Sequence, residues 1–177
     1  VIERNITPET SFVGRVEAIE KVELRARVEG FLEQRLFQEG SQVNKGDLLF
    51  VIEKEPYEIA VAQSKADLSG AQATLKNAQS DLKRKKELKK KKVVSGASLD
   101  TSETNEATAL ANVMQAKASL RKAELNLSYT NIYSPLTGYI SRSTYSIGNL
   151  VNSGSAPLAT ITSTNPIYVT VPISDKI

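Results

Sequence analysis

Hydrophobic and polar positions divide the chain into three zones. Up to about residue 55, apolar and polar residues alternate, as in Val22, Leu24, Ala26 and Val28, and glycines interrupt the pattern. This alternation is typical of short half-buried strands joined by tight turns. The same texture returns after Ser128. The sequence therefore predicts two β-rich segments separated by a long stretch of another kind.

That middle stretch, residues 56–127, carries a seven-residue repeat. Two rows are mainly apolar: Val61, Leu68, Leu75 and Leu82, and later Leu99, Glu106, Val113, Leu120 and Leu127. Each has a companion row of small residues: Ser64, Ala71 and Ala78, and later Ser102, Ala109, Ala116 and Ala123. Such a repeat predicts a left-handed coiled coil, and the small residues allow close approach of the helices. Two core helices of a globule would instead show a wider apolar face.

We therefore expect one antiparallel helical hairpin over residues 56–127. Its arms should be roughly 45–50 Å long at 1.5 Å per residue. Its tip should lie near residues 90–98, with Gly96 ending the first helix and Ser98 as the N-cap of the second.

The two β-rich segments repeat each other at a constant offset of 108 residues. Five pairs are identical at this offset: Gly30 and Gly138, Gly40 and Gly148, Val43 and Val151, Asn44 and Asn152, and Gly46 and Gly154. Recurring glycines are typical of tight turns between short strands. Neither half is large enough to bury a core alone. We expect the halves to pack together as a small β sandwich into which the hairpin is inserted.

Positive charge is concentrated at the predicted tip. Eight of the ten residues 83–92 are Lys or Arg, although the chain has a formal net charge of only +3. Outside this decade, 15 basic and 19 acidic residues leave about −4. The cluster can dock an acidic partner, bind nucleic acid, or be a solvated helix end whose lysines favour the C-terminal dipole. Nucleic-acid binding is disfavoured because no aromatic residues are interleaved with the lysines.

Composition argues against catalysis. The chain has no His and no Cys, and Met114 is its single methionine. The commonest general base, thiolate chemistry and a convincing soft-metal site are therefore missing. The carboxylates are scattered through predicted strands and turns. We expect a protein that is not an enzyme and has no cofactor or metal site.

Several stretches carry a resemblance to a known family. They are "VEGFLEQRLFQEGSQVNKGDLLFVIEKEPYE", "LNLSYTNIYSPLTGYISRS", "GNLVNSG" and "NPIYVTVPIS". Together they resemble the HlyD-like periplasmic adaptors, or membrane fusion proteins, of bacterial tripartite efflux pumps. "NPIYVTVPIS" looks most like the branch that serves resistance-nodulation-division (RND) pumps.

The resemblance implies an α+β fold in which a long antiparallel coiled-coil hairpin splits a lipoyl-like β sandwich. It assigns residues 21–55 and 128–164 to the sandwich and 56–127 to the hairpin. Residues 1–20 and 165–177 would supply strands to a β-barrel domain mostly missing from this chain. The glycines at the sandwich turns would be structural: Gly30, Gly40, Gly46, Gly138, Gly148 and Gly154.

The resemblance also implies a docking site at the tip. In this family, an Arg, a Leu four residues later and a Ser seven residues after that engage a TolC-type outer-membrane channel. Arg84, Leu88 and Ser95 fit both spacings. The lysines at 89–92 would form an electrostatic surround: Lys89, Lys90, Lys91 and Lys92.

The implied function is a periplasmic adaptor that bridges an inner-membrane RND transporter and the TolC-type channel in small-molecule export. It would be anchored to the inner membrane, assemble as a ring of several copies and bind no nucleic acid. One alternative is an adaptor of an ABC-type exporter with the same fold. Another is a carrier domain with biotin or lipoate on Lys54, but "KEPYE" lacks the carrier's flanking pattern, which favours a plain surface lysine.

Overall fold

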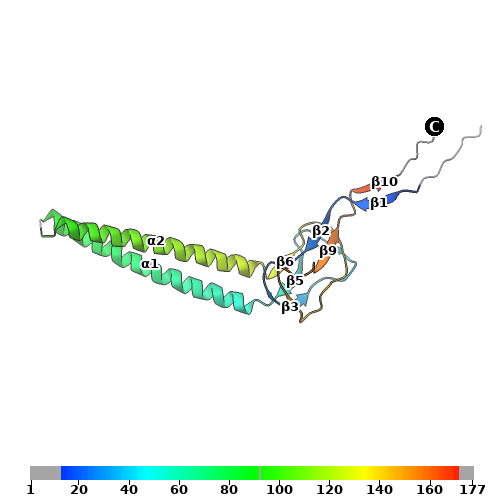
Figure 1. The fold of residues 1–177 in the computed structure, drawn as a ribbon, viewed down its shortest axis with the longest axis horizontal. Helices are drawn as coiled ribbons and strands as arrows, with labels where there is room; N and C mark the ends of the chain where they lie inside the picture. The colour runs from blue at the N-terminus through cyan, green and yellow to red at the C-terminus, as the bar shows by residue number, and fades with distance from the viewer. Residues whose placement is uncertain (1–12, 92, 172–177) are drawn as a thin grey trace, which may run out of the picture.

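The computed structural model describes residues 13–91 and 93–171. Two long helices extend from a β body, and a small β ribbon projects from the other side of that body (Figure 1). The helices are α1 (Glu55–Lys90) and α2 (Gly96–Ser128), and they pack against each other as antiparallel arms. The α+β fold with an inserted hairpin is therefore confirmed.

The predicted coiled-coil seam is the contact between the two arms. Its positions are half-buried along both helices, and four of them are buried: Leu82, Leu99, Ser102 and Ala109. Pro56 fits the first turn of α1, where a missing N–H removes no helical hydrogen bond. Glu55 and Glu58 at the start of α1, and Lys89 and Lys90 at its end, complement the helix dipole.

The prediction for the turn between the helices was wrong. Gly96 is the first residue of α2, and Ser95 is its N-cap: Ser95 has an extended backbone, and its Oγ accepts a hydrogen bond from the Ser98 amide at 3.3 Å. A serine at this place satisfies an amide that has no partner within the helix. Helix α1 ends at Lys90, and its C-cap Lys91 has φ −85° and ψ 5°, so no left-handed glycine is needed to stop it.

The β body is a sandwich of two four-stranded antiparallel sheets. One has the order β2 (Lys21–Leu24), β9 (Ala159–Thr162), β7 (Gly138–Ile140), β4 (Gln42–Val43). The other has the order β6 (Asn131–Tyr133), β5 (Leu48–Ile52), β3 (Gly30–Arg35), β8 (Leu150–Val151).

A single core lies inside this sandwich. Phe37 meets Phe50 edge to face at 5.0 Å between ring centroids, a favoured aromatic geometry. Apolar side chains from both sheets surround the pair: Leu24, Leu32, Ile52, Ile140, Val151, Leu158 and Ile161. The predicted alternation is confirmed at Leu24, Ala26 and Val28, which are all buried.

The internal repeat is visible as pseudo-two-fold strand pairing. Gly30 of β3 pairs with Val151 of β8, and Gly138 of β7 pairs with Val43 of β4, which is the same pair with the two halves exchanged. The neighbouring hydrogen bonds follow this exchange. The Gly148 amide donates to the Leu32 carbonyl at 2.8 Å, and the equivalent Gly40 amide donates to the Ile140 carbonyl at 3.0 Å.

The repeated glycines occupy two kinds of position. Gly40 and Gly148 have φ of 77° and 89°, and Gly46 has φ of 94°, so these turns use a conformation that other residues rarely adopt. A Cβ on Gly138 would collide with the Thr162 carbonyl, and one on Gly30 would lie 2.7 Å from Ile52 Cγ2. Gly154 lies in a turn without a positive φ, and its amide donates to Asn152 Oδ1 at 2.9 Å.

The ribbon beyond the sandwich pairs β1 (Arg15–Ala18) with β10 (Ile167–Thr170). It shares no strand with either sheet of the sandwich. Its assignment to a β-barrel domain and the domain boundaries given above stay predictions. Residues 1–12 and 172–177 of the expected barrel segments lie outside the described residues.

Candidate functional site at the hairpin tip

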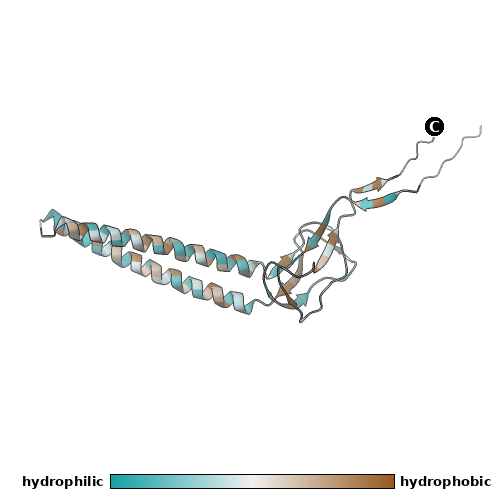
Figure 2. Cartoon of the chain, in the orientation of Figure 1, coloured by the Kyte–Doolittle hydropathy of each residue, from teal (hydrophilic) through white to brown (hydrophobic). Residues whose placement is uncertain are grey.

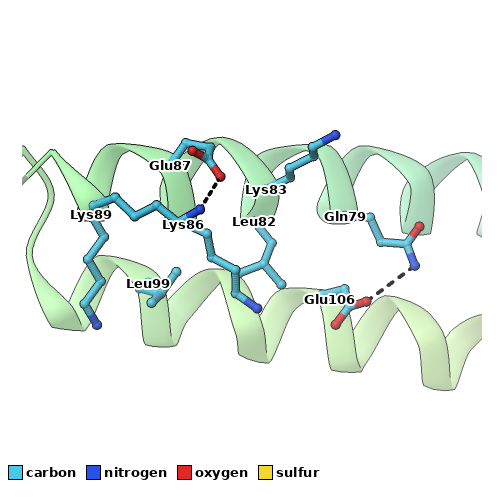
Figure 3. Close-up of a pocket in the computed structure, with 9 residues that line it drawn as sticks. Gln79, Leu82, Lys83, Lys86, Glu87, Lys89, Leu99 and Glu106 are labelled. Atoms are coloured by element: carbon cyan, nitrogen blue, oxygen red, sulfur yellow. Dashed lines mark hydrogen bonds and ion pairs between the residues drawn. The ribbon is translucent and has the colours of Figure 1, made fainter.

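The coiled-coil seam changes character near the tip. Leu82 and Leu99 are buried seam positions, and the next heptad position of α1 is Lys89 (Figure 3). Next to Leu82, Asp81 Oδ2 accepts a hydrogen bond from the buried Ser102 of α2 at 3.0 Å. The arms are therefore joined by a polar contact next to the leucines.

Asp81 also contacts two cations of α1. Lys85 Nζ lies 3.3 Å from Asp81 Oδ2, and Arg84 Nη2 lies 3.4 Å from Asp81 Oδ1. The hydrogen bond from Ser102, followed by the contacts with Lys85 and Arg84, holds the pKa of Asp81 below its ordinary value of 3.8. Asp81 is therefore ionised at neutral pH and partly neutralises the basic end of α1.

Two further contacts cross between the arms. Lys86 Nζ lies 3.3 Å from Glu103 Oε1, and Gln79 Nε2 donates to Glu106 Oε1 at 3.4 Å. Lys86 and Glu103 are half exposed, so their ion pair contributes little free energy of folding but orients both side chains.

Arg84 and Leu88 lie on the same flank of α1, one helical turn apart. The Arg84 side chain is 73% exposed and Leu88 is 40% exposed. The Leu88 carbonyl accepts hydrogen bonds from the amides of Lys91 and Val93, both at 3.1 Å, and thereby holds the start of the turn. The two side chains are available to a partner.

Ser95 has a structural task as well as its place in the spacing pattern. The hydroxyl of Ser95 caps α2, and Ser95 is exposed in the turn between the helices. The sequence pattern indicated Ser95 as a docking residue but did not indicate the cap.

The described lysines of the expected electrostatic surround do not form one surface in the structure. Lys89 and Lys90 line a groove on the flank of the tip, Lys91 caps the end of α1, and Lys92 lies outside the described residues. The groove has a volume of about 660 Å³ and is lined by Gln79, Leu82, Lys83, Lys86, Glu87, Lys89, Lys90, Leu99 and Glu106 (Figure 3). Lys90 Nζ lies 2.8 Å from Glu87 Oε1, which lowers the pKa of Glu87 below 4.5.

Sequence reasoning did not identify this groove. It treated Lys89 to Lys92 as one run and did not group Lys83 and Lys86 with Leu82 and Leu99. A helical wheel of α1 carries part of the signal, because Lys83, Lys86 and Lys90 recur at intervals of three and four. The contribution of Leu99 from the other arm depends on how the helices pair.

Lys54 is the N-cap residue at the junction of β5 and α1, in a right-handed helical conformation. Its carbonyl accepts hydrogen bonds from the amides of Tyr57 and Glu58, both at 2.9 Å. The residue therefore begins a helix, whereas a carrier lysine is expected on a turn between strands.

Among the described residues, no group of three or more acidic, His or Cys side chains could hold a metal ion. Neither helix combines the length and the hydropathy that a span of the bilayer requires.

Comparison with curated proteins finds relatives over almost the whole chain. The efflux pump periplasmic linker BepF of Brucella suis biovar 1 (strain 1330) is 49% identical over 176 residues, covering 99% of this chain and 43% of BepF. The multidrug resistance protein MdtA of Proteus mirabilis (strain HI4320) is 37% identical over 166 residues, covering 92% of this chain and 40% of MdtA. The chain thus spans less than half the length of these relatives, whose names describe a linker and a resistance protein rather than enzymes.

Solved structures with the same fold include two related to MacA. A MacA–MexA chimera that contains the Pseudomonas aeruginosa MexA α-hairpin has a TM-score of 0.61 and 32% identity, covering 92% of this chain and 54% of the chimera. MacA from Actinobacillus actinomycetemcomitans has a TM-score of 0.66 and 27% identity, covering 92% of this chain and 55% of MacA.

A family model gives the most specific match. The model described as "RND MFP, barrel-sandwich hybrid domain" matches residues 20–163, which include the sandwich and the hairpin. The match covers well over half of the chain, and it agrees with the relatives and with the fold. The chain therefore belongs to the RND membrane fusion protein family.

Proposed function

We propose that this protein is a non-enzymatic periplasmic adaptor that bridges an inner-membrane RND transporter and a TolC-type outer-membrane channel. It would take part in small-molecule export, with Arg84, Leu88 and Ser95 docking on the channel. One observation carries the proposal: the exposed side chains of Arg84 and Leu88 share one flank at the far end of a hairpin that belongs to this family.

The shape of the hairpin supports a bridging role. Helix α1 has 36 residues, so it extends for about 54 Å at 1.5 Å per residue. Docking groups at its end would reach a partner far from the sandwich (Figure 1). Binding energy at the tip would then bias the channel toward its open state, provided that the tip binds the open state more tightly.

The assembly is part of the same proposal. The full-length protein would be anchored to the inner membrane, several copies would form a ring, and the electrostatic surround of lysines would speed the encounter with the channel. The RND family match supports an RND transporter over an ABC-type exporter. The names of BepF and MdtA support a role in efflux and resistance.

The test uses the full-length protein in cells that depend on it for efflux. Arg84→Asp should abolish efflux while leaving the abundance of the protein unchanged. Arg121→Asp is the matched control, because Arg121 is also an exposed helical arginine but lies on α2 away from the tip.

Ser95 needs a control that separates docking from capping. Ser95→Arg should abolish efflux, but it also removes the cap of α2, which costs about 1 kcal/mol. Ser95→Asn keeps a capping oxygen and should retain the helix content of the wild type. Wild-type efflux in both Arg84→Asp and Ser95→Arg would contradict the docking proposal.

A further inference from the structure

We infer that the groove flank of the tip is a second docking surface, distinct from the flank of Arg84 and Leu88, and that it binds an acidic amphipathic helix. The groove flank is the surface formed by Leu82, Lys83, Lys86, Lys89, Lys90 and Leu99. The inference rests on the proposed function, because it assigns a second binding surface to the tip that is proposed to dock on a partner.

The two flanks point in different directions. At about 100° per residue, Lys83, Lys86 and Lys90 fall within roughly 60° of one another around α1. Arg84 and Leu88 lie about 150° away from the centre of that group. One partner helix lying against α1 therefore cannot contact both sets at once, and a single tip can hold two helices.

The groove flank has an apolar floor. Leu82 of α1 and Leu99 of α2 both line the groove, and each is 8% exposed (Figure 3). Glu103 lies on this flank because it pairs with Lys86, and Leu110 follows it by seven residues on the same side of α2. Leu110 is 46% exposed and Met114, one turn further, is 66% exposed. These exposed apolar side chains lie beyond the Gln79–Glu106 contact, where the apolar face of a bound helix could continue along α2.

The rim of the groove is basic. Four lysines and two glutamates line it, and Glu103 pairs with Lys86 on the same flank, which leaves a formal net charge of +1. Among the described residues, no carboxylate lies within ion-pair distance of Lys83 or Lys89. Lys86 and Lys90 have exposed partners on this chain, and such pairs are weak enough to be exchanged for carboxylates of a ligand. Charge complementarity therefore selects an acidic helix.

The combination of floor and rim favours a helix over other anionic partners. Nucleic acid would use the lysines but not a leucine floor, and no aromatic side chain lines the groove for base stacking. A membrane surface would meet the outermost lysines and leave the space between the arms unfilled. An amphipathic helix fills that space with its apolar side chains while its carboxylates reach the rim.

The experiment measures binding of a labelled peptide to the whole chain by fluorescence anisotropy at low salt. The probe is a helical peptide of about 20 residues with leucines at three- and four-residue spacing and glutamates beside them. The groove variant is Lys83→Gln with Lys90→Gln. The control is Arg84→Gln with Lys91→Gln, which removes the same charge from the opposite flank.

The groove variant should weaken binding about tenfold and the control less than about twofold, which corresponds to a difference near 1 kcal/mol. A control peptide with serines in place of the leucines should bind the wild-type chain no more tightly than the original peptide binds the groove variant. Equal losses in both variants, or equal binding of the serine peptide, would overturn the inference in favour of general charge attraction. Tighter binding to phosphatidylglycerol vesicles through the same lysines would overturn it in favour of a lipid surface.

This outcome is separable from the docking proposal. Arg84→Asp tests whether the other flank is needed for efflux, and the probe peptide tests binding to the groove flank. If Arg84→Asp abolishes efflux but the groove variant binds the peptide normally, only the inference is contradicted. If the groove variant loses peptide binding but Arg84→Asp and Ser95→Arg keep wild-type efflux, only the docking proposal is contradicted.

Discussion

The sandwich and the hairpin bury their side chains to different degrees. Phe50, Ile52 and Ile161 of the sandwich have no exposed surface, whereas the two described helices have only four buried residues, Leu82, Leu99, Ser102 and Ala109, and both leucines keep 8% exposure. Figure 2 shows brown stretches on some strands of the β body and teal on others, and mixed colours along both arms. Two sheets enclose a core from both sides, but two helices share only one seam.

This difference separates two kinds of stability. A residue of the sandwich core contacts neighbours that are far apart in sequence, so its loss affects both halves of the repeat. A residue of the hairpin contacts its own arm and a short stretch of the other. The hairpin can therefore vary the chemistry of its outer faces at little cost in folding, which suits an arm that presents docking groups.

The largest effect is expected in the sandwich core. Phe50→Ala should lower the free energy of unfolding by about 3–5 kcal/mol, because it removes a fully buried ring and leaves a cavity. Phe31→Ala is the matched control: its ring is 51% exposed, so the same truncation should cost far less. Denaturant titration measures both values, and equal losses would show that the sandwich has no dominant core.

A smaller effect is expected in the hairpin seam. Leu82→Ala should cost about 2–3 kcal/mol, near the lower end for buried leucines, because the neighbouring seam positions are only half-buried. Leu110→Ala, on the same coiled coil but half exposed, should cost less than about 1 kcal/mol. If Leu82→Ala also destabilised the sandwich, as judged by hydrogen exchange in β5 and β9, the two regions would not be as independent as the burial contrast indicates.

The smallest effect concerns the pH dependence of the tip. Because the pKa of folded Asp81 is lowered, its stabilising contribution is present above the ordinary value of 3.8 and is lost as the pH falls through the folded value. Ser102→Ala removes the largest cause of this shift, so it should raise the pKa of Asp81 toward 3.8. The stability of the hairpin should then change less as the pH falls.

NMR titration of the Asp81 carboxyl carbon measures this pKa. Thr101→Ala is the control, because Thr101 donates its hydroxyl hydrogen bond to the Ala97 carbonyl and not to Asp81. An unchanged Asp81 pKa in Ser102→Ala would show that Lys85 and Arg84, rather than the hydrogen bond across the seam, hold the carboxylate ionised.

Much of the fold could be predicted because it depends on regular patterns. The spacing of Leu68, Leu75 and Leu82 indicated the hairpin, and the offset between Gly40 and Gly148 indicated a repeated β unit. The turn was predicted less well because glycine can either end a helix or begin one. Only the reach of the Ser95 hydroxyl to the Ser98 amide distinguishes these cases.

The sequence by itself determined the periodic elements: the coiled-coil arms, the β halves and the spacing of Arg84, Leu88 and Ser95. The arms and the β halves follow from local repeats, which helices and strands convert directly into faces, whereas the spacing of the three tip residues was identified through the family resemblance. Tertiary structure alone decided that Leu99 joins Leu82 beneath the lysines, that Asp81 meets Ser102, and that the two halves exchange strands about a pseudo-two-fold axis. Those contacts depend on how distant segments pair in space, and the register of that pairing is set by the combined packing of both arms and both sheets.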